Sequence, residues 1–252
     1  MAMRKKDDRE PGAGRSGPAA KAVLSIAEAD GETLAVALVL HGGRADSYET
    51  VSGRHLSPAR MLPFARALHR KGGRHGLAVW TLRNRYRGWN GEDMSPVHDA
   101  RWALDRISQQ HPGVPVFLLG HSMGGLTALC VADDPQVQAV VALAPWIDHK
   151  TPVQPVAGRR ILIVHGTDDR WTSPAKSLDY ARRADGIAAS VDYVSLKGAG
   201  HFMVRRVGLW NVLANGFVLD AFGEATGADV SGSTEALRSA LPAAGRRLPV
   251  VL

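Results

Sequence analysis

The sequence predicts a single three-layer α/β domain, with a mostly parallel sheet of about seven strands and helices on both faces. Apolar stretches of strand length alternate with longer stretches of helical apolar spacing, which is the pattern of a parallel sheet with crossover helices. The early stretch 34–40 is nearly continuous Ala, Val and Leu, as in a strand covered on both faces. The 252 residues, 45% of them hydrophobic, are enough for one large core.

The first elements follow from local patterns. Residues 1–20 are polar and rich in Gly and Pro, so we expect a disordered N-terminal arm. Residues 22–26 fit an edge strand, and Asp30-Gly31 is a hairpin signal that would return the chain antiparallel into the strand 34–40. The remaining elements that we expect are helices at 58–70, 96–110, 126–132, 174–184 and 204–222, and strands at 77–82, 114–119, 137–143, 160–164 and 190–195.

The domain boundaries follow from the same pattern. We expect the folded domain to span residues 21–222, and residues 223–252 to form a peripheral C-terminal extension with at most one short helix at 233–240. About fifteen residues, 144–158, separate two consecutive predicted strands. This leaves no room for a cap domain, so we expect an open cleft.

Composition limits the partners that we expect. The net charge is +7, but the 24 Arg and 7 Lys are scattered and no nucleic-acid-binding motif accompanies them. The single cysteine, Cys130, excludes an intramolecular disulfide. The sequence contains neither a secretory signal nor a run of transmembrane length, so we expect a cytoplasmic protein with no membrane partner. The oligomeric state stays open.

One stretch carries the strongest functional signal. An apolar run of strand length ends in Gly120-His121-Ser122-Met123-Gly124 and passes without a spacer into an apolar helix. This is the context of a nucleophile elbow, a turn tight enough to push the serine hydroxyl clear of the backbone, where glycines remove the Cβ atoms that would clash. Ser122 is therefore the candidate nucleophile.

A serine needs a base and a group that orients the base. The strand 160–164 runs into His165-Gly166-Thr167-Asp168-Asp169, which places carboxylates just past its carboxyl end. The last strand is followed by Gly198-Ala199-Gly200-His201, which places a histidine at the same edge.

Acyl chemistry also needs donors for the negative charge that develops on the carbonyl oxygen. Two backbone N–H groups commonly supply them, at roughly 2.7–4 kcal/mol per donor. One donor should be Met123, the residue after the nucleophile. The other should come from the glycines after the strand 34–40; we favour Gly43, with Arg44 as the near alternative.

With these parts in this order, the sequence resembles an α/β-hydrolase. The matching motifs span residues 34–202 and are His41-Gly42-Gly43, Gly120-His121-Ser122-Met123-Gly124-Gly125, His165-Gly166-Thr167-Asp168-Asp169 and Gly198-Ala199-Gly200-His201. The chain order serine, acid, histidine is the one that this fold uses.

The resemblance implies roles for individual residues. Ser122 would be the nucleophile, His201 the general base and then acid, and Asp169 the partner that orients His201, with Asp168 as the alternative. The absence of room for a cap resembles lidless members such as dienelactone-hydrolase-like proteins and small carboxylesterases. Dienelactone hydrolases use a cysteine nucleophile, and Ser122 departs from that pattern.

Substrate-contacting residues are predicted from their places beside these motifs. The stretch 80–90 interleaves basic and aromatic residues after a strand end. It fits either an ordinary solvated loop or a rim that recognises an acidic substrate, with Arg83, Arg85 or Arg87 as the candidates. Trp146 and Phe202 are candidates for an apolar acyl pocket, although core packing is the competing interpretation, and Arg44 is a further candidate contact.

These features predict a serine hydrolase that cleaves a carboxylic ester of a small molecule through an acyl-enzyme. An acyltransferase or thioesterase with the same triad is the alternative, and a noncatalytic binding protein on this scaffold is a third hypothesis. We expect no cofactor, because the glycines of the elbow lack the dinucleotide-binding spacing, and no metal, because no histidine has metal-ligand spacing. His41, His121 and His165 should have positional roles.

Overall fold

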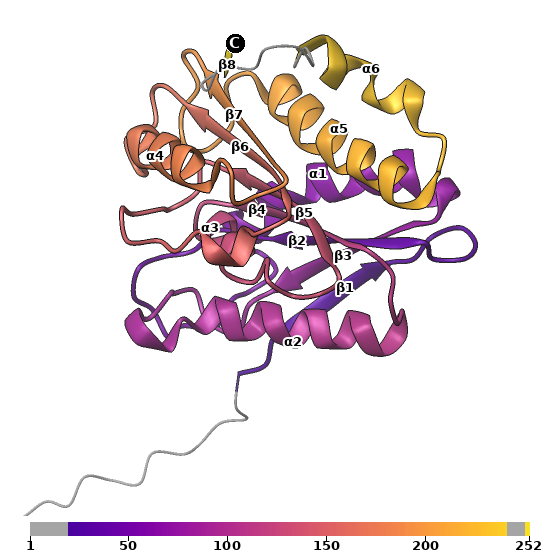
Figure 1. Cartoon of the computed structure of the whole chain (residues 1–252). Helices are drawn as coiled ribbons and strands as arrows, with labels where there is room; N and C mark the ends of the chain where they lie inside the picture. Colours follow the sequence, from indigo (N-terminus) through magenta and orange to yellow (C-terminus); the bar gives the residue numbers. More distant parts are fainter. Residues whose placement is uncertain (1–19, 241–249) are drawn as a thin grey trace, which may run out of the picture.

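The computed structural model of the chain describes residues 20–240 and 250–252. It confirms the three-layer α/β architecture: α1 and α5 cover one face of the sheet, with α6 packed on α5, and α2, α3 and α4 cover the other face (Figure 1). The strands are β1 (Val23–Ala27), β2 (Ala35–Leu40), β3 (Leu77–Arg83), β4 (Val116–His121), β5 (Val137–Leu143), β6 (Arg160–Gly166), β7 (Ser190–Leu196) and β8 (Val250–Val251). The helices are α1 (Leu56–Gly72), α2 (Ser95–Gln110), α3 (Met123–Cys130), α4 (Pro174–Ala184), α5 (Val207–Thr226) and α6 (Ser231–Ala240).

The sheet runs in the order β1-β3-β2-β4-β5-β6-β7-β8, with eight strands among the described residues rather than about seven. All neighbours pair in parallel except β1, which is antiparallel to β3. The predicted hairpin between β1 and β2 is therefore wrong, since β3 lies between them. The turn at Asp30-Gly31 reverses the chain, but β2 needs a partner on both edges because its residues are all buried, and β3 and β4 fill both places.

The core is split into two by the sheet. Alternate residues of β2 face opposite sides, as strand geometry requires: Ala37 and Val39 pack with α1 and α5, whereas Val36 and Leu38 pack with α2, α3 and α4. This explains the continuous apolar stretch in the sequence, since both faces of the strand are covered.

The C-terminal segment contributes more than the expected short helix. Helix α5 continues to Thr226, four residues past the predicted end of the domain, and α6 begins at Ser231. Val230 and Leu237 are buried in the core cluster below α5, and β8 pairs with the edge strand β7. Residues 1–19 of the predicted N-terminal arm and residues 241–249 of the predicted extension lie outside the described residues.

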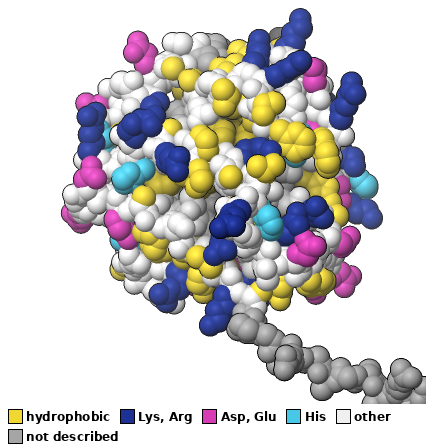
Figure 2. Space-filling model, turned by 180° about the vertical axis from the view of Figure 1, so that it is seen from behind, with side chains coloured by type: hydrophobic (Ala, Val, Ile, Leu, Met, Phe, Trp, Pro, Cys, Tyr) yellow, Lys and Arg dark blue, Asp and Glu magenta, His cyan; other side chains and the backbone are white. Residues whose placement is uncertain are grey.

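The connection from β5 to β6 holds only a single turn of 3-10 helix, Gln154–Val156, so no cap domain is inserted there. Throughout the part of the chain that the structure describes, no helix is long and apolar enough to cross a membrane. On the face seen in Figure 2, Lys and Arg side chains are scattered among acidic and hydrophobic ones and form no continuous basic block.

Candidate active site

Ser122 lies on a strained turn between β4 and α3. Its backbone has φ 55° and ψ −118°, a region that costs a non-glycine residue roughly 1–3 kcal/mol. The flanking glycines make the turn possible: a Cβ on Gly120 would lie 2.1 Å from the carbonyl oxygen of Gly124, and one on Gly124 would lie 2.5 Å from that of Leu40. Strand β4 runs to His121 and α3 starts at Met123, so the elbow is tighter than the sequence prediction, which began the helix at residue 126.

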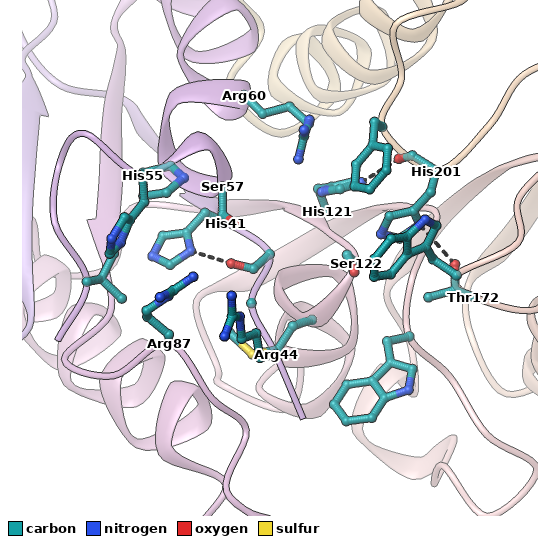
Figure 3. Close-up of a pocket in the computed structure, with 18 of the residues that line it drawn as sticks. His41, Arg44, His55, Ser57, Arg60, Arg87, His121, Ser122, Thr172 and His201 are labelled. Carbon is teal, nitrogen blue, oxygen red and sulfur yellow. Dashed lines mark hydrogen bonds between the residues drawn. The ribbon is translucent and has the colours of Figure 1, made fainter. Parts of the chain in front are cut away.

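His201 follows β7 and bonds to Asp169, which follows β6. The imidazole Nδ1–H donates to Asp169 Oδ2 at 2.8 Å, and both side chains are buried. Because Nδ1 is engaged, Nε2 is the nitrogen that remains, and it has no partner among the described residues. His201 and Ser122 line the same cavity and lie beside one another in Figure 3.

Asp169 accepts more hydrogen bonds than a single histidine supplies. Its Oδ1 accepts from the backbone N–H groups of Trp171 (2.8 Å) and Thr172 (2.9 Å), and Oδ2 also accepts from the Thr172 hydroxyl (2.8 Å). Burial alone would raise the pKa of this carboxyl, but the hydrogen bonds from His165, His201 and the two backbone amides hold that pKa well below its usual value. The alternative acid, Asp168, is exposed, and its Oδ1 accepts from the Thr167 hydroxyl.

A second histidine contacts the same carboxylate. His165 is fully buried at the end of β6; its Nε2 lies 3.2 Å from Asp169 Oδ2, and its Nδ1 lies 2.9 Å from Ser177 Oγ. Since a carboxylate only accepts, Nε2 carries the proton and Nδ1 accepts from the serine hydroxyl. The predicted positional role of His165 therefore has a specific form, whereas Thr172 was not predicted because nothing in the sequence distinguishes it from other loop hydroxyls.

His41 fixes the peptide that precedes Gly43. Its Nδ1–H donates to the Gly42 carbonyl oxygen at 2.7 Å, and its Nε2 accepts from the Asn84 N–H at 3.2 Å. In a trans peptide the N–H points opposite to the carbonyl, so the Gly43 N–H faces away from His41. The Arg44 N–H donates to the Arg87 carbonyl oxygen at 2.8 Å and is not available as a second donor, which leaves Gly43.

The backbone N–H of Met123, like that of Gly43, is unpaired in the described part of the chain. Neither N–H has a hydrogen-bond acceptor within residues 20–240 and 250–252. A Cβ on Gly42 would lie 3.3 Å from Ser122 Cβ, so the two loops are in close contact at Ser122. Two unpaired backbone donors thus flank Ser122, as acyl chemistry requires.

His121 is bonded to the loop that carries His201. Its Nε2–H donates to the backbone carbonyl oxygen of His201 at 2.9 Å, and the two rings lie 4.9 Å apart. Burial, followed by the charge of His201, lowers the pKa of His121 to about 3. It is therefore neutral at ordinary pH and holds the His201 loop in place without taking a proton.

A cavity of about 590 Å³ opens above Ser122. Of the predicted substrate contacts, Arg44, Trp146 and Phe202 line it, with Trp146 37% and Phe202 40% exposed. The prediction for Arg85 is wrong: this residue is not among the lining residues, and its guanidinium pairs with Asp99 at 2.5 Å. The reason is that Asp99, buried on α2, also accepts from the Arg85 N–H, which turns the side chain toward α2.

Of the other two arginine candidates in the stretch 80–90, one lines the cavity and one does not. Arg83 donates to the Val51 carbonyl oxygen and lies outside this cavity, whereas Arg87 lines it. Among the described residues, no group of three or more His, Cys, Asp or Glu side chains converges in a way that could hold a metal ion.

Comparisons with known proteins agree with this fold. A family model described as serine aminopeptidase, S33, matches residues 75–161, a stretch that contains Ser122 but neither Asp169 nor His201. No curated protein matches the sequence.

Solved structures match most of the chain. A lidless α/β serine hydrolase from Xanthomonas campestris, XC6422, is 18% identical, with 81% of this chain and 91% of that one covered and a TM-score of 0.58. The thermophilic esterase Est2 from the Planctomycetes species Thermogutta terrifontis, with propionate bound, is 17% identical, with coverages of 81% and 89% and a TM-score of 0.60. An α/β serine hydrolase homologue from Coxiella burnetii is 19% identical, with coverages of 79% and 93% and a TM-score of 0.59.

At these identities the structural matches establish the fold, which is the three-layer α/β-hydrolase fold without a cap domain. The fold and the family match together place the chain in the α/β-hydrolase superfamily.

Proposed function

We propose that the protein is a serine hydrolase that cleaves a carboxylic ester through an acyl-enzyme intermediate, with Ser122, His201 and Asp169 as its triad. The observation that carries this proposal is the 2.8 Å hydrogen bond from His201 Nδ1 to Asp169, on the same cavity as a strained Ser122. A binding protein gains nothing from a strained serine, a neighbouring imidazole and a buried carboxylate in one place.

The first step is attack of Ser122 Oγ on the ester carbonyl carbon. His201 Nε2 accepts the hydroxyl proton, and the imidazolium that forms is stabilised by the Asp169 carboxylate. Because the pKa of Asp169 is lowered, this carboxyl stays ionised throughout the step and keeps the proton on Nδ1. His201 then donates its Nε2 proton to the leaving alkoxide, which departs as the alcohol.

The carbonyl oxygen becomes an oxyanion during attack. The Gly43 and Met123 N–H groups are its proposed donors, each contributing roughly 2.7–4 kcal/mol to the transition state. Both amides are held by elements that cannot rotate freely: the Gly42 carbonyl is bound to His41, and Met123 opens helix α3. This preorganisation is what makes backbone donors effective.

The second step releases the acid. With no cap over the β5–β6 connection, water reaches the acyl-enzyme from the open side of the cavity. His201 takes a proton from this water, the hydroxide attacks the acyl carbon, and Ser122 recovers its proton as the carboxylic acid leaves.

The test combines labelling with turnover. The wild-type protein should react with a fluorophosphonate probe and hydrolyse short p-nitrophenyl esters, and Ser122→Ala should abolish both, with kcat/KM falling by at least about 10³-fold. Ser57→Ala is a matched control, because Ser57 lines the same cavity but lies on α1, and it should retain labelling.

Two results would contradict the proposal. If Ser122→Ala retained turnover, Ser122 would not be the nucleophile. If the folded wild-type protein neither reacted with the probe nor hydrolysed any ester, the hypothesis of a noncatalytic binding protein would be favoured. Product analysis with added alcohol separates hydrolysis from acyl transfer, since a transferase would form the new ester in preference to the acid.

A further inference from the structure

The cavity above Ser122 has an unbalanced charge. Its lining includes the arginines Arg44, Arg60 and Arg87, and neither Asp nor Glu is among the lining residues. A low-dielectric site lined by one sign of charge concentrates ligands of the opposite sign. These arginines differ in whether they have an intramolecular partner.

Arg87 is partly neutralised and Arg44 is not. The Arg87 guanidinium pairs with Glu49, an exposed residue. The Arg44 side chain, which is exposed, has no ion pair or hydrogen bond with any residue that the structure describes. Its backbone is nevertheless fixed, because its N–H is bound to Arg87 and its carbonyl oxygen to the Trp89 N–H.

Arg60 is the most informative of the three. It lies on the second turn of α1, is half-buried, and has no carboxylate partner within the described ranges. Its guanidinium carbon sits 4.8 Å from the centroid of the Phe202 ring, next to the catalytic histidine in the chain. Partial burial lowers the pKa of this guanidinium, since removing a cation from water without a counter-ion costs free energy.

The position of Arg60 relates it to the reacting groups. Its positive charge contributes to the lowered pKa of His121, whose ring lies 4.9 Å from that of His201. Figure 3 shows Arg60 at the top of the cavity and Arg44 below it, with Ser122 to one side of both, next to His201. The guanidinium carbon lies over the Phe202 ring, and no side-chain N–H of Arg60 donates to a residue that the structure describes. A planar fork of N–H donors suits carboxylate or phosphate oxygens.

We propose that this cavity selects esters that carry a second, negatively charged group, a carboxylate or a phosphate, and that Arg60 binds this group, with Arg44 as a supporting cation. The proposal rests on the ester hydrolysis proposed above and names its substrate class. The sequence indicates Arg85 as a candidate for binding an acidic substrate, but Arg85 is paired with Asp99. The residue proposed here, Arg60, lies on helix α1, where no sequence motif indicates a role.

The experiment compares matched esters with and without the charge. Monomethyl succinate against dimethyl succinate tests a carboxylate on the acyl side, and the acetate ester of glycerol 3-phosphate against glycerol monoacetate tests a phosphate on the alcohol side. We expect wild-type kcat/KM to favour the charged member of at least one pair by about tenfold or more, and to lose part of that preference as ionic strength rises.

The variants isolate Arg60. Arg60→Gln should lower kcat/KM for the preferred anionic ester by about tenfold or more while changing its neutral counterpart by less than about twofold, and Arg60→Lys should recover part of the loss because it keeps the charge. Arg66→Gln is the matched control, since Arg66 is an exposed arginine on the same helix outside this cavity, and it should change neither ester.

A binding arm separates failure of this proposal from failure of the proposed function. In a Ser122→Ala background, titration with monomethyl succinate and with glycerol 3-phosphate should show binding that Arg60→Gln weakens. Ester hydrolysis without charge preference, or equal losses on both members of a pair in Arg60→Gln, would overturn the anion site and leave the hydrolase intact. Arg60-dependent anion binding by a protein that hydrolyses no ester would keep the anion site and overturn the hydrolase.

Discussion

At the scale of single residues, Asp169 is the most constrained group of the site. Three side-chain donors and two backbone amides converge on its two oxygens. Each restricts the rotation of the carboxylate, so the direction of its bond to His201 is set by the whole β6–α4 loop and not by the histidine alone. This precision matters because a triad acts through the orientation of its imidazole.

His165 supplies one of these bonds from a fully buried position, and its removal should affect turnover more than binding. We expect His165→Leu to lower kcat by about tenfold with little change in KM, because a hydrogen bond to a charged acceptor contributes about 1.5–3 kcal/mol. His165→Gln retains an N–H donor of similar reach and should recover most of the kcat. Steady-state kinetics on one p-nitrophenyl ester, with active sites counted by fluorophosphonate titration, measures both effects.

The conservative variant makes this prediction specific. If His165 only filled space in the core, Leu and Gln would lose activity together and in proportion to the folded fraction. Equal kcat values for the two variants per titrated site would show that the bond to Asp169 does not position the acid.

At the scale of elements, the sequence is most informative where a buried strand leads directly into a loop. β5 and α4 were predicted with their observed bounds, and Ser122, Asp169 and His201 were each predicted from a short motif at a strand's carboxyl end. Such motifs are readable because a tight turn restricts residue choice locally: only glycine fits at position 120, where the Gly124 carbonyl would contact any Cβ.

The misassigned features depend on contacts between distant segments. β1 pairs with β3 because both edges of β2 are already occupied, by β3 and β4. The local sequence at Asp30-Gly31 does not contain that information. Arg85 is turned away by Asp99, and Arg60 reaches the cavity only because α1 packs beside the loop of Phe202. The residues that line the cavity were therefore harder to predict than the places of Ser122, Asp169 and His201 at the sheet edge.

The elbow also gives a prediction at this scale. Gly120→Ala places a Cβ against backbone atoms that cannot move aside, so we expect the free energy of unfolding to fall by roughly 1–3 kcal/mol or more, with loss of fluorophosphonate labelling. Gly208→Ala is the same substitution in an exposed part of helix α5 with open space around it, and it should be neutral or stabilise by roughly 0.5–1 kcal/mol. Urea unfolding followed by tryptophan fluorescence measures both. Equal stabilities for the two variants would mean that the elbow can relax.

At the scale of the whole molecule, the parallel sheet brings the site together. β2, β4, β6 and β7 all run in one direction, so the segments after them, with Gly43, Ser122, Asp169 and His201, meet at one edge although they span most of the chain. This is the edge where ligands of open α/β sheets bind. The arrangement requires a folded sheet, which ties activity to stability.

That stability should depend on pH through buried histidines. Burial lowers the pKa of His41 to about 4 and that of His121 to about 3, and it also lowers the pKa of His165. In the unfolded chain a histidine takes up its proton near pH 6.5. The folded state therefore binds fewer protons than the unfolded state below that pH, and stability present at neutral pH is lost as the pH falls. The lowered pKa of Asp169 acts in a separate window, below about pH 4.

We accordingly expect the free energy of unfolding to decrease between about pH 6 and pH 5 with a slope that approaches about 1.4 kcal/mol per pH unit for each of these histidines. Urea unfolding at a series of pH values measures this slope. His41→Gln should reduce this slope by the contribution of one histidine, even if the substitution also lowers stability at pH 7. His98→Gln, on the exposed face of α2, should leave the slope unchanged. A flat profile over this range would mean that His41 and His121 accept protons in the folded state, and the bonds from His41 to Gly42 and from His121 to the His201 loop could not then depend on neutral imidazoles.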